Sequence, residues 1–372
     1  MVTRIWCYIH RWHKKQQSLK NMETITINRE EIIKMAHEFE SGFFTHKAAW
    51  HGLGNVLKEP PTVEEALVAS KTNWKVIEKP VYADMGQEFD KDNIKDVKKT
   101  PVSASNIPTY KAIVRETDKR VLGIVGANYQ PVQNIEAFQW FDFLLKNKQA
   151  TLEAGGSLKD GQKVWVLAKL LGEKEVVKND AVRSYLLLCN SHDGSLSLIV
   201  KFTPIRVVCM NTLNAALSGN SNDERKGQAI TIKHTNGIIE QMEFAKDLVN
   251  TTTLKFNDSI QLFKKFAKKK MTDKEFEGYF TKVWYGNRMD LDLIKEVDLQ
   301  RAKRWDLLRQ LFDSGKGQEI KNVRGTVWAG YNAMTEYVDY YRDYRNDKLD
   351  SLWFGSGADL RYRAFREAEK MV

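Results

Sequence analysis

The sequence has few of the residues from which disulfide frameworks and metal centres are built. Its 372 residues include three cysteines, Cys7, Cys189 and Cys209, and seven histidines. An odd number of cysteines without zinc-ligand spacing argues against a disulfide framework or a zinc site, and fits a reducing cytoplasm. Cys189 and Cys209 lie in apolar runs, where core residues are more common than nucleophiles. We therefore expect a cytoplasmic protein without a metal or a cofactor.

Long apolar runs and the common hydrolase motifs are also missing. No run approaches the roughly 20 apolar residues that a membrane helix needs, so we expect no membrane partner. The sequence contains no Gly-x-Ser-x-Gly elbow, His-Glu-x-x-His motif, P-loop or dinucleotide-binding glycine pattern. A nuclease that holds a metal with carboxylates stays open, because acidic residues are abundant and their spacing does not exclude it.

What the chain does have is apolar residues for a core and an excess of basic residues. A hydrophobic fraction of 42% and ten tryptophans indicate a folded globular protein. The net charge is +10, but residues 1–21 carry five basic and no acidic residues, which leaves +5 for the rest. Met22 is a plausible start, so residues 1–21 are interpreted as a dispensable basic extension that is not necessarily native.

The stretch from Val182 to Leu217 organises the predicted sheet. Two apolar runs, Ser184–Cys189 and Ser195–Phe202, flank a polar segment that contains Asp193-Gly194. Asp-Gly between strand-like runs is typical of a tight hairpin, because glycine adopts positive φ at little cost. We expect Gly194 to occupy such a position in a two-residue turn.

Three further elements are predicted downstream of this hairpin. Thr203-Pro204 is expected to break the strand, and Ile205–Met210 to form a short strand of its own. Asn211-Thr212 before Leu213 and an Ala-Ala-Leu run predicts a capped helix over Asn211–Leu217. Thus the sequence predicts strand, turn, strand, break, strand and helix.

Periodicity and capping signals place the other elements before residue 238. Thr62, with Glu65 three residues later, predicts a capping box, and Asn134 predicts a second helix cap. The glycines of Ala154–Leu158 predict a turn, and residues 28–40 predict a helix. Strands are predicted over residues 74–82, 110–115, 121–125, 164–171 and 229–234.

From Ile238 onward the pattern becomes helical. Helices are predicted over residues 238–249, 257–270, 273–284, 290–312 and 325–344. The predicted fold class is α+β, with a mainly antiparallel sheet and packed helices followed by a helical C-terminal region. We divide the chain into the extension 1–21, a core domain 22–250 and a helical region 251–372.

Polar side chains lie at the turns and strand ends of the central stretch, where rigid elements often present functional groups. The alternative is structural: His192 and Asp193 only form the turn, and Arg206 pairs with a carboxylate. In the functional interpretation, basic side chains line a groove and contact phosphates, while Asn211 bonds to the backbone or a base. The candidate nucleic-acid-binding residues are Arg183, His192, Asp193, Lys201, Arg206, Asn211, Lys233 and His234.

The C-terminal region offers a second binding signature. Tyr337, Tyr341 and Tyr344 share one helical face near Arg342 and Arg345, so they could stack on single-stranded bases. An aromatic stripe is more often part of a core. The lysine cluster within Lys264–Lys270 could follow a phosphate backbone, or it could be a solvated helix face.

Six blocks of sequence resemble a known family. They are AAWHGLG, GGSLKDGQKVWVLAK, SHDGSLSLIVKFTPIRVVCMNTLNAAL, IKHT, GTVWAGYNAMTEYVDYY and WFGSGADL, in this order from about residue 42 to 360. They resemble the phage/plasmid-related domain of unknown function 932 family. The resemblance implies a gene of phages, prophages or plasmids in a bacterial host. The family has no established catalytic residues to assign to this sequence, so the resemblance leaves the chemistry open. By association, it favours a role in DNA replication or recombination.

The leading hypothesis is a non-enzymatic nucleic-acid-binding protein of a phage or plasmid. Its sharpest form is single-stranded DNA binding or annealing, with a homo-oligomer as the expected assembly because annealing proteins form rings or filaments. One alternative is a metal-dependent nuclease or other phosphodiester hydrolase around His192, Asp193 and Arg206. Another is a structural or host-interaction protein with no nucleic-acid role.

Overall fold

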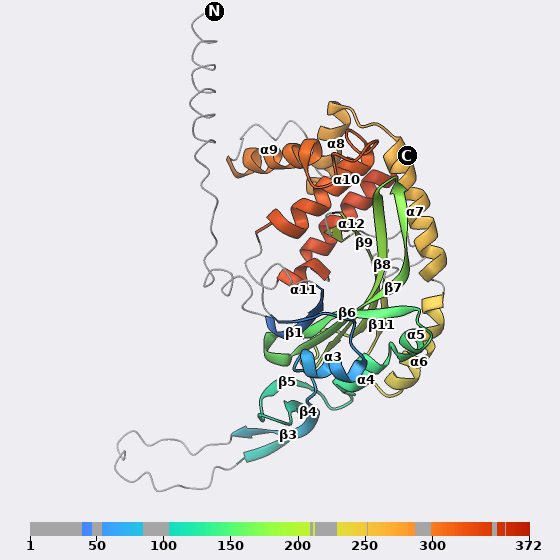
Figure 1. Cartoon of the computed structure of the whole chain (residues 1–372). Helices are drawn as coiled ribbons and strands as arrows, with labels where there is room; N and C mark the ends of the chain where they lie inside the picture. The colour runs from blue at the N-terminus through green and yellow to red at the C-terminus, as the bar shows by residue number, and fades with distance from the viewer. Residues whose placement is uncertain are drawn as a thin grey trace, which may run out of the picture. The chain divides into compact units, whose positions relative to one another are not determined.

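A computed structural model of the chain (Figure 1) describes nine segments. All of them belong to one compact unit, Glu38–Val372. The described residues are 39–46, 54–84, 104–208, 211–212, 229–250, 252–286, 299–343, 348–353 and 355–372. The predicted extension, residues 1–21, lies outside them. No helix within these segments is long and apolar enough to cross a membrane.

The larger sheet has the strand order β10-β9-β8-β7-β6-β1-β2, and β11 also pairs with β9. Every pairing is antiparallel except that of β1 with β2. The strands are β1 (Phe39–Thr45), β2 (Asn55–Leu57), β6 (Ala150–Leu158), β7 (Lys163–Val177), β8 (Asp180–Ser191), β9 (Leu198–Arg206), β10 (Asn211–Thr212) and β11 (Ala229–Ile232). This arrangement confirms the predicted mainly antiparallel sheet.

Both faces of the central strands are buried, which explains their nearly continuous apolar sequences. On one face, Leu186 and Val200 join the main core, and Phe202 contacts Phe256 of helix α7 (Thr252–Lys268) with ring centres 6.0 Å apart. On the other face, Trp165 packs in a second cluster with Leu187 and Cys189. Cys189 is therefore a core residue, as predicted.

The smaller sheet is antiparallel, with the order β3-β4-β5. Its strands are β3 (Val76–Asp84), β4 (Ala104–Arg115) and β5 (Val121–Gly126). They confirm the three strands predicted in this part of the chain, although β4 begins earlier than expected. Ile113 and Leu122 are buried and join this sheet to the main core.

Short helices link the strands of the first half of the chain. Thr62 caps α3 (Val63–Ala69) with the predicted capping box, in which Thr62 N donates to Glu65 Oε2 over 2.8 Å. The second predicted cap is shifted by one residue, because Gln133 is the N-cap of α4 (Asn134–Gln139). The remaining elements are α5 (Asp142–Lys146) and a 3₁₀ turn, η1 (Lys159–Gly161).

The C-terminal region is helical among its described residues, as predicted. Its helices pack around an aromatic core in which Phe263 lies 4.9 Å from Trp328, between ring centres. Figure 1 shows α7 running alongside β7, and α10 near α12. Besides α7, the elements are α6 (Ile238–Asn250), α8 (Asp273–Tyr285), α9 (Leu299–Ser314), α10 (Val327–Glu336), the π-helical turn η5 (Tyr337–Tyr341), α11 (Lys348–Trp353) and α12 (Ser356–Glu369).

Two predictions about glycine and proline in the large sheet are wrong. Gly155 and Gly156 do not form a turn but lie within β6, where a Cβ on Gly156 would be 2.2 Å from the Ser41 carbonyl oxygen of β1. Pro204 does not break β9, which continues to Arg206. Among the described residues, no strand pairs with Pro204 on the outer side of β9, so its missing N–H is tolerated.

Three boundary predictions also fail. Asn211 begins strand β10 rather than a helix, because it pairs with Arg206 at the sheet edge, and residues 213–217 lie outside the described part. Phe39 belongs to β1, so the helix predicted over residues 28–40 does not extend to its expected end. Gly194 has the predicted positive φ of 74°, but its turn is longer than two residues because β8 ends at Ser191 and β9 begins at Leu198.

Candidate functional site

The predicted groove residues do not share one surface. Val182 of β8 pairs with Arg206, whereas His192 directly follows Ser191 at the opposite end of β8. Nine residues at roughly 3.3 Å each separate these ends by about 30 Å along the strand. Arg206 and Lys201 also point to opposite faces of β9, because they are five residues apart. The predicted groove is therefore wrong as a single site.

His192 is a buried structural residue. Asn134 Nδ2 donates to the Thr72 carbonyl over 2.9 Å, which leaves Asn134 Oδ1 as the acceptor for His192 Nε2, also 2.9 Å away. His192 is therefore assigned as the neutral tautomer that carries its proton on Nε2, and Nδ1 has no partner among the described residues. Burial, aided by nearby His234, lowers the pKa of His192 to about 3.

Asp193 forms the turn that follows His192. Its Oδ1 accepts hydrogen bonds from Ser195 N over 2.9 Å and from Ser191 Oγ over 2.8 Å. Burial opposes ionisation of this carboxyl, but the bonds from Ser195 and Ser191 prevail and hold its pKa below the usual value. These hydrogen bonds fit the structural interpretation, in which Asp193 only forms the turn.

His234 lies beside the same end of the sheet, just after β11. Its ring stacks on Tyr129 with centres 4.6 Å apart, and its Nδ1 lies 3.0 Å from the Gln130 carbonyl oxygen, to which it donates. Burial lowers the pKa of His234, which favours the neutral ring. Lys233 is exposed, so His234 and Lys233 do not present a shared basic surface.

Arg206 forms a buried ion pair instead of lining a groove. The side chains of Arg206 and Asp180 are both 0% exposed, and two hydrogen bonds of 2.7 and 2.6 Å join them. Arg206 also donates to the Lys316 and Gly317 carbonyls, and Trp328 Nε1 donates to Asp180 Oδ2 over 2.8 Å. This network ties the sheet to α10, so the structural alternative holds for Arg206.

Arg183 and Lys201 also have local partners. Arg183 donates to Glu173 on the neighbouring strand over 2.7 Å, and this hydrogen bond raises the arginine pKa. Lys201 donates to the Trp353 carbonyl over 3.0 Å. Burial and the nearby Arg361 cation lower the pKa of Lys201 to about 8. The side chain of Asn211 lies outside the described part of the structure.

The two described tyrosines of the predicted stacking face differ in exposure, because one lies in the core and the other at the surface. Tyr337 is buried and contacts Trp284, with ring centres 5.7 Å apart. Tyr341 is 50% exposed, and Tyr344 lies outside the described residues. The predicted stacking face is wrong for Tyr337, because this ring closes the helical core.

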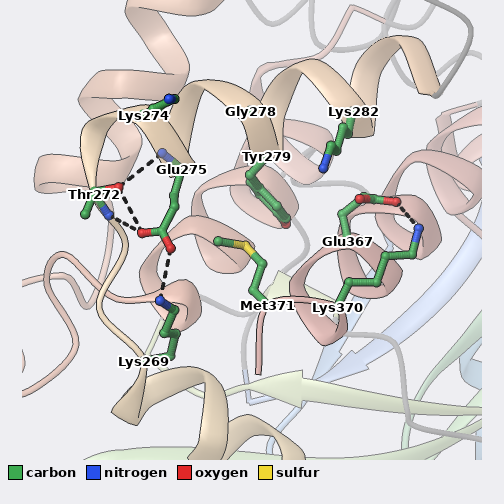
Figure 2. Close-up of a pocket in the computed structure, with 10 residues that line it drawn as sticks. All are labelled: Lys269, Thr272, Lys274, Glu275, Gly278, Tyr279, Lys282, Glu367, Lys370 and Met371. Carbon is green, nitrogen blue, oxygen red and sulfur yellow. Dashed lines mark hydrogen bonds and ion pairs between the residues drawn. The ribbon is translucent and has the colours of Figure 1, made fainter.

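A basic cleft that sequence analysis did not identify lies between α8 and α12, next to the end of α7 (Figure 2). It has a volume of about 590 Å³. Four of its lining residues are lysines and two are glutamates. The lining residues are Lys269, Thr272, Lys274, Glu275, Gly278, Tyr279, Lys282, Glu367, Lys370 and Met371. The predicted lysine cluster pointed to this region, but only Lys269 from it lines the cleft.

The pairing of these charges leaves a net positive cleft. Lys269 lies 3.0 Å from Glu275 and Lys370 lies 2.5 Å from Glu367, whereas Lys274 and Lys282 form no ion pair with a described residue. Hydrogen bonds from Thr272 and the Lys269 ammonium lower the pKa of Glu275 to about 2. Glu275 is therefore ionised but already engaged, and Lys274 and Lys282 can meet an added anion.

Thr272 positions α8 beside this cleft. Its hydroxyl accepts from Glu275 N over 3.2 Å while Glu275 Oε2 accepts from Thr272 N over 2.8 Å, a capping box that fixes the first turn. Tyr279, one turn further, is buried and donates to the Ala364 carbonyl of α12 over 2.9 Å. These bonds fix the start of α8 and join α8 to α12, which Lys370 directly follows.

Within the described residues, no group of three or more His, Cys, Asp or Glu side chains is arranged to hold a metal ion.

The chain was compared with known protein families. Residues 121–353 match the family model described as "Domain of unknown function (DUF932)". The chain belongs to this family. No curated protein and no solved structure matches it.

Proposed function

We propose that the protein binds nucleic acid through the cleft between α8 and α12. The observation that carries this proposal is the convergence of four lysines in one concave site. They are Lys274 and Lys282 of α8, Lys269 directly after α7 and Lys370 directly after α12. Phosphate contacts by lysine supply most of the sequence-independent affinity for nucleic acids. A role in the replication or recombination of a phage or plasmid, by single-strand binding or annealing, is part of this proposal.

The unpaired lysines give the cleft its affinity for a polyanion. Lys274 and Lys282 lie two helical turns apart on α8, about 12 Å at 1.5 Å per residue. Lys370, directly after α12, lies across the cleft from Lys282, beside Glu367 (Figure 2). A phosphate backbone that passes through the cleft therefore meets cations on both sides.

No contact favours the hydrolase alternative. His192 is fully buried, and Asp193 is occupied by two serines of its own turn. Arg206 lies at the other end of β8, paired with Asp180. These side chains do not converge on a common point, so they form no catalytic constellation.

The test compares two double variants that change the net charge equally. Lys274→Glu with Lys282→Glu reverses the unpaired cations of the cleft. Lys75→Glu with Lys79→Glu, at two exposed lysines at or beside β3 that form no ion pair with a described residue, is the matched control. Binding of a fluorescein-labelled dT oligonucleotide is measured by fluorescence anisotropy at low salt.

The cleft variant is expected to bind at least tenfold more weakly than the control variant, with an unchanged melting temperature. Equal affinities for the two variants, or no binding by the wild-type protein at low salt, would refute the proposal. A homo-oligomer, the assembly expected of an annealing protein, is also part of this proposal, and mass photometry with and without the oligonucleotide tests it. A monomer under both conditions would contradict that part alone.

A further inference from the structure

The lining of the cleft changes from charged at its sides to small and apolar at its centre. Gly278 lies between Lys274 and Lys282 on α8, and Met371 and Tyr279 also line the cleft (Figure 2). A Cβ added to Gly278 would meet no atom within 4 Å, so the space above this glycine is open. The centre of the cleft therefore offers an uncharged surface flanked by cations.

We infer that this cleft accepts one unpaired nucleotide, with the base over Gly278 and Met371 and the phosphates on the flanking lysines. This inference rests on the proposed function and adds to it the class of substrate, a single strand with a base turned into the protein. The volume of about 590 Å³ falls in the range of small-ligand pockets, roughly 300–1,000 Å³. A thioether such as that of Met371 makes favourable contacts with aromatic rings.

A duplex cannot use this site in the same way. Its bases are paired and stacked inside the helix, so only its phosphates reach the lysines at the sides of the cleft. Extruding a base from a duplex costs unstacking and unpairing energy, and this cost is least for a base that is already single-stranded. The lysines alone would bind both forms, whereas the open space above Gly278 favours the single strand.

Gly278 offers a test that leaves every charge in place. Gly278→Leu puts an apolar side chain into the open space, and leucine has a higher helix propensity than glycine. Gly126→Leu is the matched control, because a Cβ at this exposed position of β5 also meets no atom within 4 Å. Thermal melts establish that both variants fold.

The probes are labelled dT12, an abasic 12-mer of the same phosphate number and a 12-base-pair duplex. We expect Gly278→Leu to weaken dT12 binding at least tenfold, with the duplex and the abasic strand unaffected and Gly126→Leu like wild type. Equal binding of dT12 by Gly278→Leu and wild type would overturn the inference. It would not decide the proposed function, which the lysine variants test separately. In a competition experiment, free dTMP is added at a concentration equal to that of the nucleotides in dT12. Complete displacement of dT12 would also overturn the inference, because the pocket would then be a site for a mononucleotide.

Discussion

Acidification from pH 7 to pH 5 is expected to destabilise the protein through His192. This imidazole is fully buried, and its proton on Nε2 is donated to Asn134. Burial lowers its pKa from 6.5 to about 3 in the folded state. The unfolded chain exposes His192 to water, where an ordinary histidine pKa applies.

The direction of the effect depends on which state binds the proton first. As the pH falls below about 6.5, the unfolded state becomes protonated while folded His192 stays neutral, so unfolding is favoured. Stability is therefore full above the unfolded pKa and falls progressively until the folded pKa, about 3, is reached. At 1.36 kcal/mol per pKa unit, the loss between pH 7 and pH 5 is about 2 kcal/mol from His192. Buried His234, whose pKa is also lowered, adds to it.

The assay is urea unfolding at pH 7, 6 and 5 for the wild type, His192→Gln and His46→Gln. Glutamine can still donate from Nε2 toward Asn134 but does not titrate. Between pH 7 and pH 5, the free energy of unfolding of His192→Gln should therefore fall by about 2 kcal/mol less than that of the wild type. His46, which is exposed at the end of β1, is the matched control and should keep the wild-type dependence. Equal pH dependence in the wild type and His192→Gln would refute the assignment of His192 as a buried neutral ring.

Three further predictions concern stability. Arg206→Met should cost about 3–5 kcal/mol in urea unfolding, because Asp180 would remain buried without its cation; a loss below about 1 kcal/mol, or loss of DNA binding at unchanged stability, would contradict the structural role. Gly194→Val should cost about 1 kcal/mol or more, because φ is 74° there, and an unchanged denaturation midpoint would argue against that backbone. Thr272→Ala should remove the cap of α8 and cost about 1 kcal/mol, with an unchanged melting temperature as the contrary result.

Local signals in the sequence predicted much of the fold. The Thr62 capping box, the strands of the smaller sheet and the helices after Ile238 depend on residues close in sequence, whose pattern is visible without knowing the fold. The two apolar runs on either side of Asp193-Gly194 likewise identified β8 and β9. These elements establish the α+β class, because their order along the chain is itself diagnostic.

The failures arise where the presence or absence of a neighbouring strand decides the conformation. Gly156 looks like a turn residue, but it is needed in β6 because β1 approaches too closely for a Cβ. Pro204 looks like a break, but it is accommodated where the edge of β9 has no outer partner among the described strands. Asn211 looks like a helix cap, but it pairs with Arg206 at the edge of the sheet.

The candidate site could be predicted only in outline. A polar residue in an apolar strand, such as Arg206, indicates a partner but not whether this is a ligand or a carboxylate such as Asp180, which lies 26 residues away. The cleft joins Lys269 to Lys370, which are separated by about a hundred residues of sequence. The lysine cluster before Met271 was the one signal for it, and the packing of α8 against α12 determines the rest.

The salt dependence of single-strand binding tests the central claim most directly. Four lysines in the cleft, at a slope of roughly −0.7 per phosphate contact, give about −3 in a plot of log affinity against log salt. Removing two contacts with Lys274→Gln and Lys282→Gln should reduce this slope to about −1.4, while the same substitutions at Lys75 and Lys79 leave it at about −3. Anisotropy titrations with poly-dT and mixed-sequence oligonucleotides should give the same slopes. A flat salt response in the wild type, or an equal slope in the cleft and control variants, would contradict nucleic-acid binding by this cleft.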